Sequence, residues 1–147
     1  MRSLLRGFAT LVSAAAVATL LVGCDPPAPT SDTVVIRSGP DGLEIAVCED
    51  FHVRRVLFDY RFPGAKWVST SWEDLDQVVV PGDRVDLPGP TRLPDASVLV
   101  EGTDVYVIVN DGSGVADTRF EMTAQPIDEN WLQPGGARTN DPCPLGS

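Results

Sequence analysis

The chain has 147 residues, with 11 basic and 21 acidic side chains, and its net charge at neutral pH is −10. An acidic chain repels the phosphates of nucleic acid and of anionic lipid headgroups, which argues against nucleic acid or a bare lipid surface as a partner. The length allows one domain with a sizeable core and is too short for two.

The first 23 residues have the layout of a secretory signal peptide. Arg2 and Arg6 are the only charged residues before position 25, and residues 7–20 are almost wholly apolar. A basic start followed by a short apolar core is typical of such signals. A membrane-spanning helix needs about 20 apolar residues, and here a glycine and two prolines soon follow the run. We therefore expect residues 1–23 to be removed on export.

The apolar run ends in Leu21-Val22-Gly23-Cys24, which resembles the lipobox of bacterial lipoproteins. The resemblance implies that a diacylglyceryl group is joined to the Cys24 sulfur and that signal peptidase II cuts before this residue. Two acyl chains anchor a protein stably where one binds only reversibly. We thus expect a lipoprotein on the extracytoplasmic face of the cell membrane, held by lipid rather than by a spanning helix. The alternatives are a plain secretory signal with an accidental cysteine and an uncleaved anchor helix.

The mature chain divides into a tether and one domain. Residues 24–32 are rich in proline and should form a semi-extended tether of about 3 Å per residue. Residues 33–147 form the domain. Cleavage leaves 9 basic and 21 acidic residues, a net charge of −12, with Lys66 as the sole lysine. The acidic residues are dispersed, which favours a role in solubility over the recruitment of cations or of a basic partner.

The cysteine count predicts a disulfide. Lipid on Cys24 would leave Cys48 and Cys143 as an even pair in an oxidising compartment. A bridge between them would enclose nearly the whole domain. Two separate thiols are the alternative, and two cysteines with one distant histidine do not make a metal site.

The domain sequence alternates as β-strands do, with turn residues between the runs. Residues 33–37 and 43–48 flank a Gly-Pro-Asp-Gly turn, and residues 51–62 form the longest run. Further strands are expected at 66–70, 77–80, 84–87, 97–100, 104–109 and 118–123. We expect a hairpin between 97–100 and 104–109, a helical turn at 72–76 and an irregular segment at 88–94.

Eight or so short strands predict an all-β, antiparallel fold. We expect a small sandwich of the immunoglobulin or fibronectin kind, with a small β-barrel as the alternative. The spacing of Cys48, Trp67 and Cys143 differs from that of a true immunoglobulin domain, so the bridge would pin a C-terminal tail to an early strand.

Catalytic motifs are not evident. His52, the only histidine, starts a strand, and Gly112-Ser113-Gly114 lies in a turn rather than in a nucleophile elbow. We expect a structural or solvent-facing imidazole. No phosphate-binding glycine loop or zinc helix is present, and we expect no cofactor.

Two acidic segments have oxygen groups suited to calcium. One is Asn110 with Asp111 to Asp117, and the other is Glu73 to Asp76. The first lacks the alternating ligands of an EF-hand loop, and its residues suit a hairpin turn. We expect a turn in both places.

Three hypotheses follow for the function. The first is a non-enzymatic binding domain for a protein or a cell-wall component, and the second is an accessory scaffold of an envelope complex. The third is a small cell-wall enzyme that uses paired carboxylates. Trp67, Trp72 and Trp131 could offer aromatic faces to sugar or peptide, although packing is the favoured role for the close pair Trp67 and Trp72.

Overall fold

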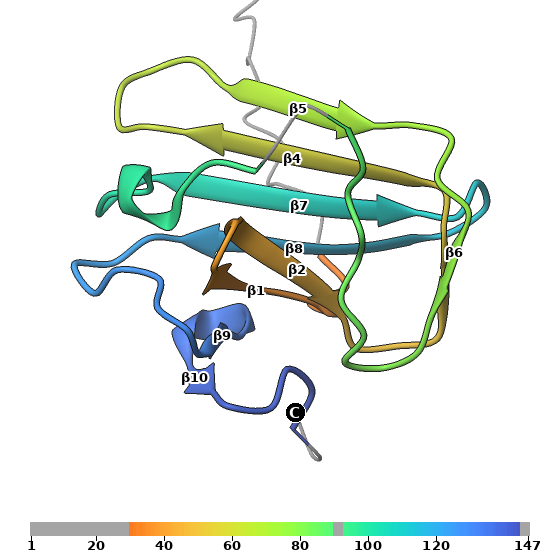
Figure 1. The fold of residues 1–147 in the computed structure, drawn as a ribbon. Helices are drawn as coiled ribbons and strands as arrows, with labels where there is room; N and C mark the ends of the chain where they lie inside the picture. The colour runs from red at the N-terminus through yellow and green to blue at the C-terminus, as the bar shows by residue number, and fades with distance from the viewer. Residues whose placement is uncertain (1–29, 90–92, 145–147) are drawn as a thin grey trace, which may run out of the picture.

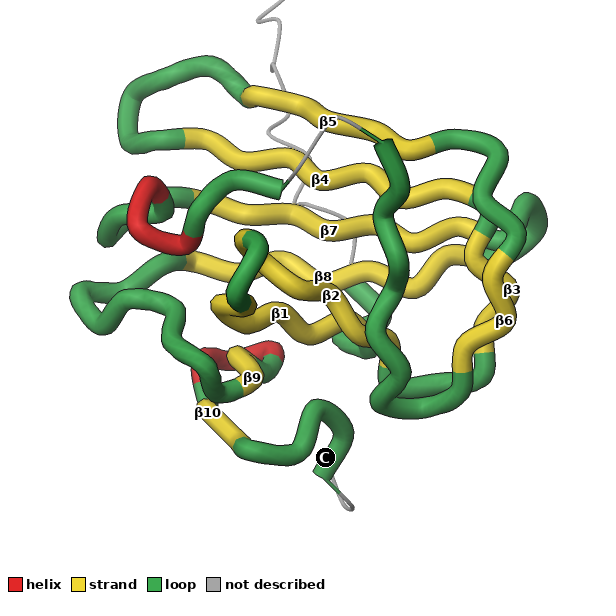
Figure 2. Tube along the Cα trace, viewed as in Figure 1, coloured by secondary structure: helices red, strands yellow, loops and turns green. Residues whose placement is uncertain are grey.

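The computed structural model describes residues 30–89 and 93–144, and this part is almost entirely β-structure (Figures 1 and 2). The predicted signal peptide and Cys24 lie outside it. In chain order the strands are β1 (Val34–Gly39), β2 (Gly42–Val47), β3 (Phe51–Val53), β4 (Arg55–Arg61), β5 (Val68–Trp72), β6 (Gln77–Val79), β7 (Asp104–Asn110), β8 (Val115–Glu121), β9 (Trp131–Leu132) and β10 (Arg138–Thr139). Two short 3₁₀ helices, η1 (Ala96–Val98) and η2 (Pro134–Gly136), complete the list. No helix in the described residues is long and apolar enough to span a membrane.

Two four-stranded antiparallel sheets form a sandwich. The central sheet has the order β5-β4-β7-β8, and the terminal sheet has the order β10-β9-β1-β2. Strands β3 and β6 pair with each other at one side of the molecule (Figure 2). The sheets do not close on themselves in the described residues. The prediction of a small sandwich is confirmed, and the alternative of a small barrel is wrong. That the sandwich is of the immunoglobulin or fibronectin kind stays a prediction.

The core lies between the inner faces of the two sheets. Alternate residues of β2 point inward, and Leu43, Ile45 and Val47 are all buried. In the central sheet, Phe58 of β4 and Val107 of β7 are paired and fully buried. Burial of apolar surface contributes about 25 cal/mol per Å², so this two-sided contact is the main source of stability.

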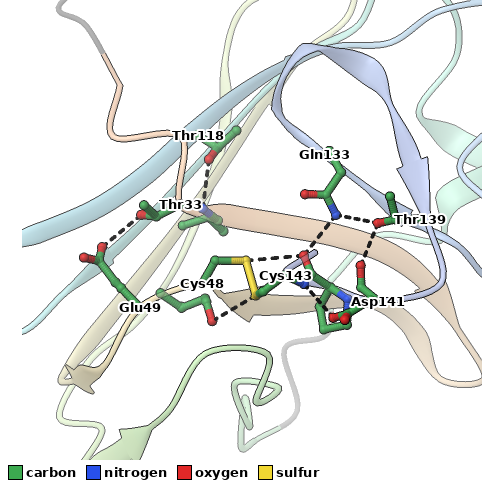
Figure 3. The surroundings of a disulfide bond; sticks show 11 residues. Thr33, Cys48, Glu49, Thr118, Gln133, Thr139, Asp141 and Cys143 are labelled. Atoms are coloured by element: carbon green, nitrogen blue, oxygen red, sulfur yellow. Dashed lines mark hydrogen bonds between the residues drawn. A yellow bond between two sulfur atoms is a disulfide. The ribbon is translucent and has the colours of Figure 1, made fainter. Parts of the chain in front are cut away.

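The C-terminal tail extends the terminal sheet through β9 and β10, and Trp131 of β9 lies on the outer face of that sheet. Val35 and Ala46 are paired on that face, and both are buried in a small cluster with Trp131. Cys48 and Cys143 are joined by a disulfide bond with their Cα atoms 5.4 Å apart, as the cysteine count predicts (Figure 3). The bridge fixes the end of the tail beside β2.

Hydrogen bonds within the tail shape it around the bridge. The Gln133 side-chain amide donates to Thr139 Oγ1 (2.8 Å) and to the Pro142 carbonyl (2.9 Å). The backbone N–H of Cys143 donates to Asp141 Oδ1 (3.0 Å). The tail is therefore an ordered part of the fold rather than a loose extension (Figure 3).

The predicted strand over residues 51–62 is two strands in two different sheets. The chain turns at Arg54, whose N–H donates to the Asn110 carbonyl (2.9 Å) and whose carbonyl accepts from the Leu75 N–H (2.9 Å). These bonds replace ladder bonds, so β3 leaves the central sheet and pairs with β6. Alternation alone does not reveal this corner, because hydrophobic residues continue on both sides of it.

The predicted hairpin between 97–100 and 104–109 is wrong. The Asp95 carboxylate accepts from the Ser97 N–H (2.8 Å) and starts η1, while both edges of β7 are occupied by β4 and β8. A strand at 97–100 would have no edge of β7 to join.

Two further local predictions need correction. The helical turn predicted at 72–76 is absent, because Trp72 pairs with Val56 as the last residue of β5. The segment 84–87 is not a strand, although Arg84 forms one isolated bridge with Ala46 of β2. The described ends of the irregular segment 88–94, residues 88–89 and 93–94, carry no helix or strand.

Candidate functional site

The outer face of the central sheet is a solvent-facing surface built from all four of its strands. Side chains that alternate away from the core come from all four strands. They are Leu57, Asp59, Arg61, Ser69, Ser71, Tyr106, Ile108, Asp117 and Arg119, with Trp67 just before β5. Among the described residues, the N-terminal segment contacts this face at Asp117, where Ser31 is bonded.

Trp67 is the exposed tryptophan of this face. It is 42% exposed, whereas Trp72 is 5% and Trp131 is 3% exposed. The Arg61 guanidinium lies 4.8 Å from the centre of the Trp67 ring, and Arg61 Nε also donates to Asp104 Oδ2 (3.2 Å). The packing role predicted for the close pair therefore fits Trp72 and not Trp67, because only Trp72 points into the core.

A second aromatic group of the face is Tyr106. The Arg119 guanidinium lies 5.3 Å from its ring centre, and its hydroxyl donates to Asp117 Oδ2 (2.6 Å). Burial first, and then the hydrogen bond to Asp117, raise the pKa of Tyr106 to about 12. The phenol thus stays neutral at physiological pH and keeps its bond to the carboxylate.

The end of the predicted tether is fixed to β8 at Asp117. The Ser31 N–H donates to Asp117 Oδ1 (2.7 Å), and the Ser31 hydroxyl accepts from the Asp117 N–H (2.7 Å). The Asp32 N–H donates to the Asp117 carbonyl (2.8 Å). Asp117 is 8% exposed, so one buried carboxylate serves both the tether and Tyr106. The attachment of the chain that leads to Cys24 is therefore specific.

His52 is paired with a carboxylate at the surface. Its Nε2 lies 2.6 Å from Asp76 Oδ1, and this hydrogen bond holds the pKa of Asp76 below its usual value. The Ser113 hydroxyl donates to Asp111 (2.9 Å) rather than to the imidazole. The structure therefore does not bring His52 and Ser113 together as a nucleophile and its base.

The loop from Asn110 to Asp117 is a hairpin turn between β7 and β8. Asn110 Oδ1 accepts from the Gly112 N–H (2.6 Å), and Asp111 Oδ1 accepts from the Ser113 N–H (2.6 Å). Asp117 points to Ser31 and Tyr106 instead. The oxygen groups of this segment are thus used within the turn and do not converge.

The acidic segment Glu73 to Asp76 is also divided among neighbours. Glu73 pairs with Arg55 (2.9 Å) and Asp76 with His52. No group of three or more His, Cys, Asp or Glu side chains in residues 30–89 and 93–144 is arranged to hold a metal ion.

A hollow beside β2 contains Glu44, whose side chain is 15% exposed. Its lining includes Asp41, Glu44, Arg84 and Asp86. Burial raises the pKa of Glu44, but hydrogen bonds from Arg37 (2.6 Å) and Arg84 (2.7 Å) outweigh it, and the net shift is downward. A general acid needs the opposite shift, so Glu44 does not suit that role.

Comparison of the chain with protein-family models, with curated proteins and with solved structures finds no match. The candidate site therefore rests on the residues themselves. Sequence reasoning missed the attachment of Ser31 to Asp117, because serine in a Pro-rich segment gives no signal of its distant partner. The alternation around Arg61 and Trp67 could have placed Trp67 on the outer face.

Proposed function

We propose that the protein is a lipoprotein, anchored through acylated Cys24 to the extracytoplasmic face of the cell membrane. Its β-sandwich is a non-enzymatic domain that binds a partner protein or a cell-wall component. The sequence Leu21 to Cys24 and the Cys48–Cys143 bridge, which suits an oxidising compartment, support the location.

The observation that carries the proposal is the attachment of Ser31 to β8. Only six residues, 25–30, separate the acylated cysteine from this fixed point. Fully extended, these residues reach about 20 Å at roughly 3.4 Å each. The domain is therefore held close to the membrane surface, and its partner must be reachable from there.

The open face of the central sheet supports binding rather than catalysis. Trp67 offers an exposed aromatic surface, and Arg61, Asp59 and Ser69 supply hydrogen-bonding groups beside it. Aromatic and arginine side chains are enriched where proteins bind their partners. Where carboxyl pKa values in the described residues depart clearly from normal they shift downward, as at Glu44, Asp111 and Asp128, which suits hydrogen bonding and not acid catalysis.

The test compares binding by the acylated mature protein and two variants of it. Membranes that carry the protein are mixed with purified cell wall, and envelope proteins captured with it are identified by mass spectrometry. Trp67→Ala should reduce the specific capture at least tenfold, since interface tryptophans often contribute more than 1.4 kcal/mol. Val78→Ala, an exposed site on β6 outside the central sheet, is the matched control and should bind normally. Equal capture by all three proteins would contradict the proposal.

A further inference from the structure

The four outer strand edges of the two sheets differ in how they are protected. At the edge of β2, the Gly82 and Val85 N–H groups donate to the Val47 and Ile45 carbonyls (3.0 and 2.9 Å). The opposite edge of that sheet is β10, which has only two residues. The edge of β8 is occupied by Ser31 at Asp117.

The edge of β5 has none of these protections. The backbone of Val68–Trp72 bonds only to β4 among the described residues. The strand is Val-Ser-Thr-Ser-Trp, with no charge, no proline and no glycine. Natural proteins normally guard such edges with charges, prolines, bulges or covering segments, because an open edge pairs with other strands. An unguarded edge in an otherwise guarded fold marks an interaction surface.

We propose that two copies of this protein pair through β5, antiparallel and about a twofold axis at Thr70. In this register Thr70 faces Thr70 of the second copy, Ser69 faces Ser71, and Val68 faces Trp72. All five residues of the strand are then paired, whereas a shift by two residues in either direction leaves part of it unpaired. Hydroxyl pairs such as Thr–Thr and Ser–Ser stabilise neighbouring strands.

Charges at the ends of β5 complement each other in this arrangement. Lys66, the sole lysine, precedes the strand, and Glu73 and Asp74 follow it. The twofold axis brings Lys66 of one copy to the end of the seam where Glu73 and Asp74 of the second copy leave the strand. This local complementarity acts against the repulsion between two acidic domains, which salt screens at distances beyond about 10 Å.

The symmetry also suits anchorage of both copies to one membrane, a point that rests on the proposed function. A twofold axis perpendicular to the sheet reverses the strand direction but leaves both outer faces on the same side. Ser31 is bonded to the outward-pointing Asp117 carboxylate, so both tethers start from that side. Five paired residues form a small interface, and confinement to a membrane raises the effective concentration that such an interface needs.

The test is disulfide crosslinking of the full-length protein in intact membranes. Thr70→Cys places two thiols opposite each other across the axis, with Cβ atoms about 4.5–5.5 Å apart. We expect a covalent homodimer on a non-reducing gel, at a yield at least tenfold above that of Val115→Cys on β8, because pairing greatly exceeds random collision. Ser69→Cys should crosslink less than Thr70→Cys, since residue 69 faces residue 71.

A second variant separates pairing from folding. Ser71 is exposed, so Ser71→Lys should leave the thermal unfolding temperature unchanged and still abolish the Thr70→Cys crosslink by placing charges at the seam. Val115→Lys is its control and should retain the crosslink. Crosslinking no better than at Val115, persistence of the dimer in Ser71→Lys, or crosslinking of Thr70→Cys mainly to another protein would overturn the proposal. Repeating the assay with Cys24→Ala shows whether a failure comes from the anchor or from the strand.

Discussion

The two sheets of the sandwich treat their outer faces differently. The outer face of the terminal sheet carries the buried cluster of Val35, Ala46 and Trp131, and the Cys48–Cys143 bridge joins the end of the C-terminal tail to this sheet. The outer face of the central sheet is open and carries Trp67. One face therefore contributes to stability, and the other is free to meet a partner.

Two tryptophans show the same contrast with similar neighbours. The Arg37 guanidinium lies 4.5 Å from the centre of the Trp131 ring, and the Arg61 guanidinium lies 4.8 Å from the centre of the Trp67 ring. Trp131 is 3% exposed and Trp67 is 42% exposed. A neighbouring arginine thus does not decide the role of a tryptophan; burial in a cluster with Val35 and Ala46 sets Trp131 apart.

Removal of the disulfide should have the largest effect. The bridge joins residues 95 positions apart, and replacing both Cys48 and Cys143 by Ala should lower the free energy of unfolding by about 4 to 5 kcal/mol on the chain-entropy model. Urea titration monitored by tryptophan fluorescence measures this change. A loss below about 1 kcal/mol would mean that the tail stays attached without the bridge.

Truncation of the two tryptophans tests the contrast directly. Trp131→Ala should cost about 3 kcal/mol of unfolding free energy, because it opens a cavity over Val35 and Ala46. Trp67→Ala should cost less than about 1 kcal/mol, because the ring is largely in water. Thermal unfolding of both variants provides the measurement, and equal losses would refute the division of roles between the two faces.

Loss of the Asp117 carboxylate, which Ser31 and Tyr106 share, should lower the free energy of unfolding by an intermediate amount. The disturbance should be confined to the central sheet. Asp117→Ala leaves the Ser31 N–H and the Tyr106 hydroxyl without their acceptor, which should cost about 1 to 3 kcal/mol. It should also speed protease cleavage near residue 31, because the end of the tether is released. The exposed Asp50→Ala serves as the control, and the account fails here if both variants are cleaved at the same rate.

Alkaline titration should produce the smallest effect. Burial and Asp117 raise the pKa of Tyr106 to about 12 in the folded chain, above the usual 10.0. The unfolded chain therefore loses the phenol proton first, so the contribution to stability is present below pH 10 and is lost between pH 10 and about 12. Absorbance near 295 nm should show a late-ionising phenol that is missing in Tyr106→Phe. If the variant titrates like the original protein, the assignment to Tyr106 is wrong.

The sequence predicted the fold class well because alternation reports which face of a strand is buried. Leu43, Ile45 and Val47 follow this rule, as do Phe120 and Met122. Prediction from alternation failed at Arg54, where a hydrogen bond to Asn110 redirects the chain, and at Ser97, where a hydrogen bond to Asp95 does so. Neither bond changes the hydrophobic pattern. The cysteine count predicted the bridge, but the Ser31–Asp117 contact joins residues 86 positions apart that carry no shared signal.

The most direct test of the account is the mass of the N-terminal peptide of the mature protein from its own membranes. We predict a peptide that begins at Cys24 and carries a diacylglyceryl group on the sulfur, and a Cys24→Ala protein that stays full length and unlabelled by fatty acid. A mature protein that begins at another residue, or a Cys24 without lipid, would contradict the claim that this domain is held at the membrane by a short acylated tether.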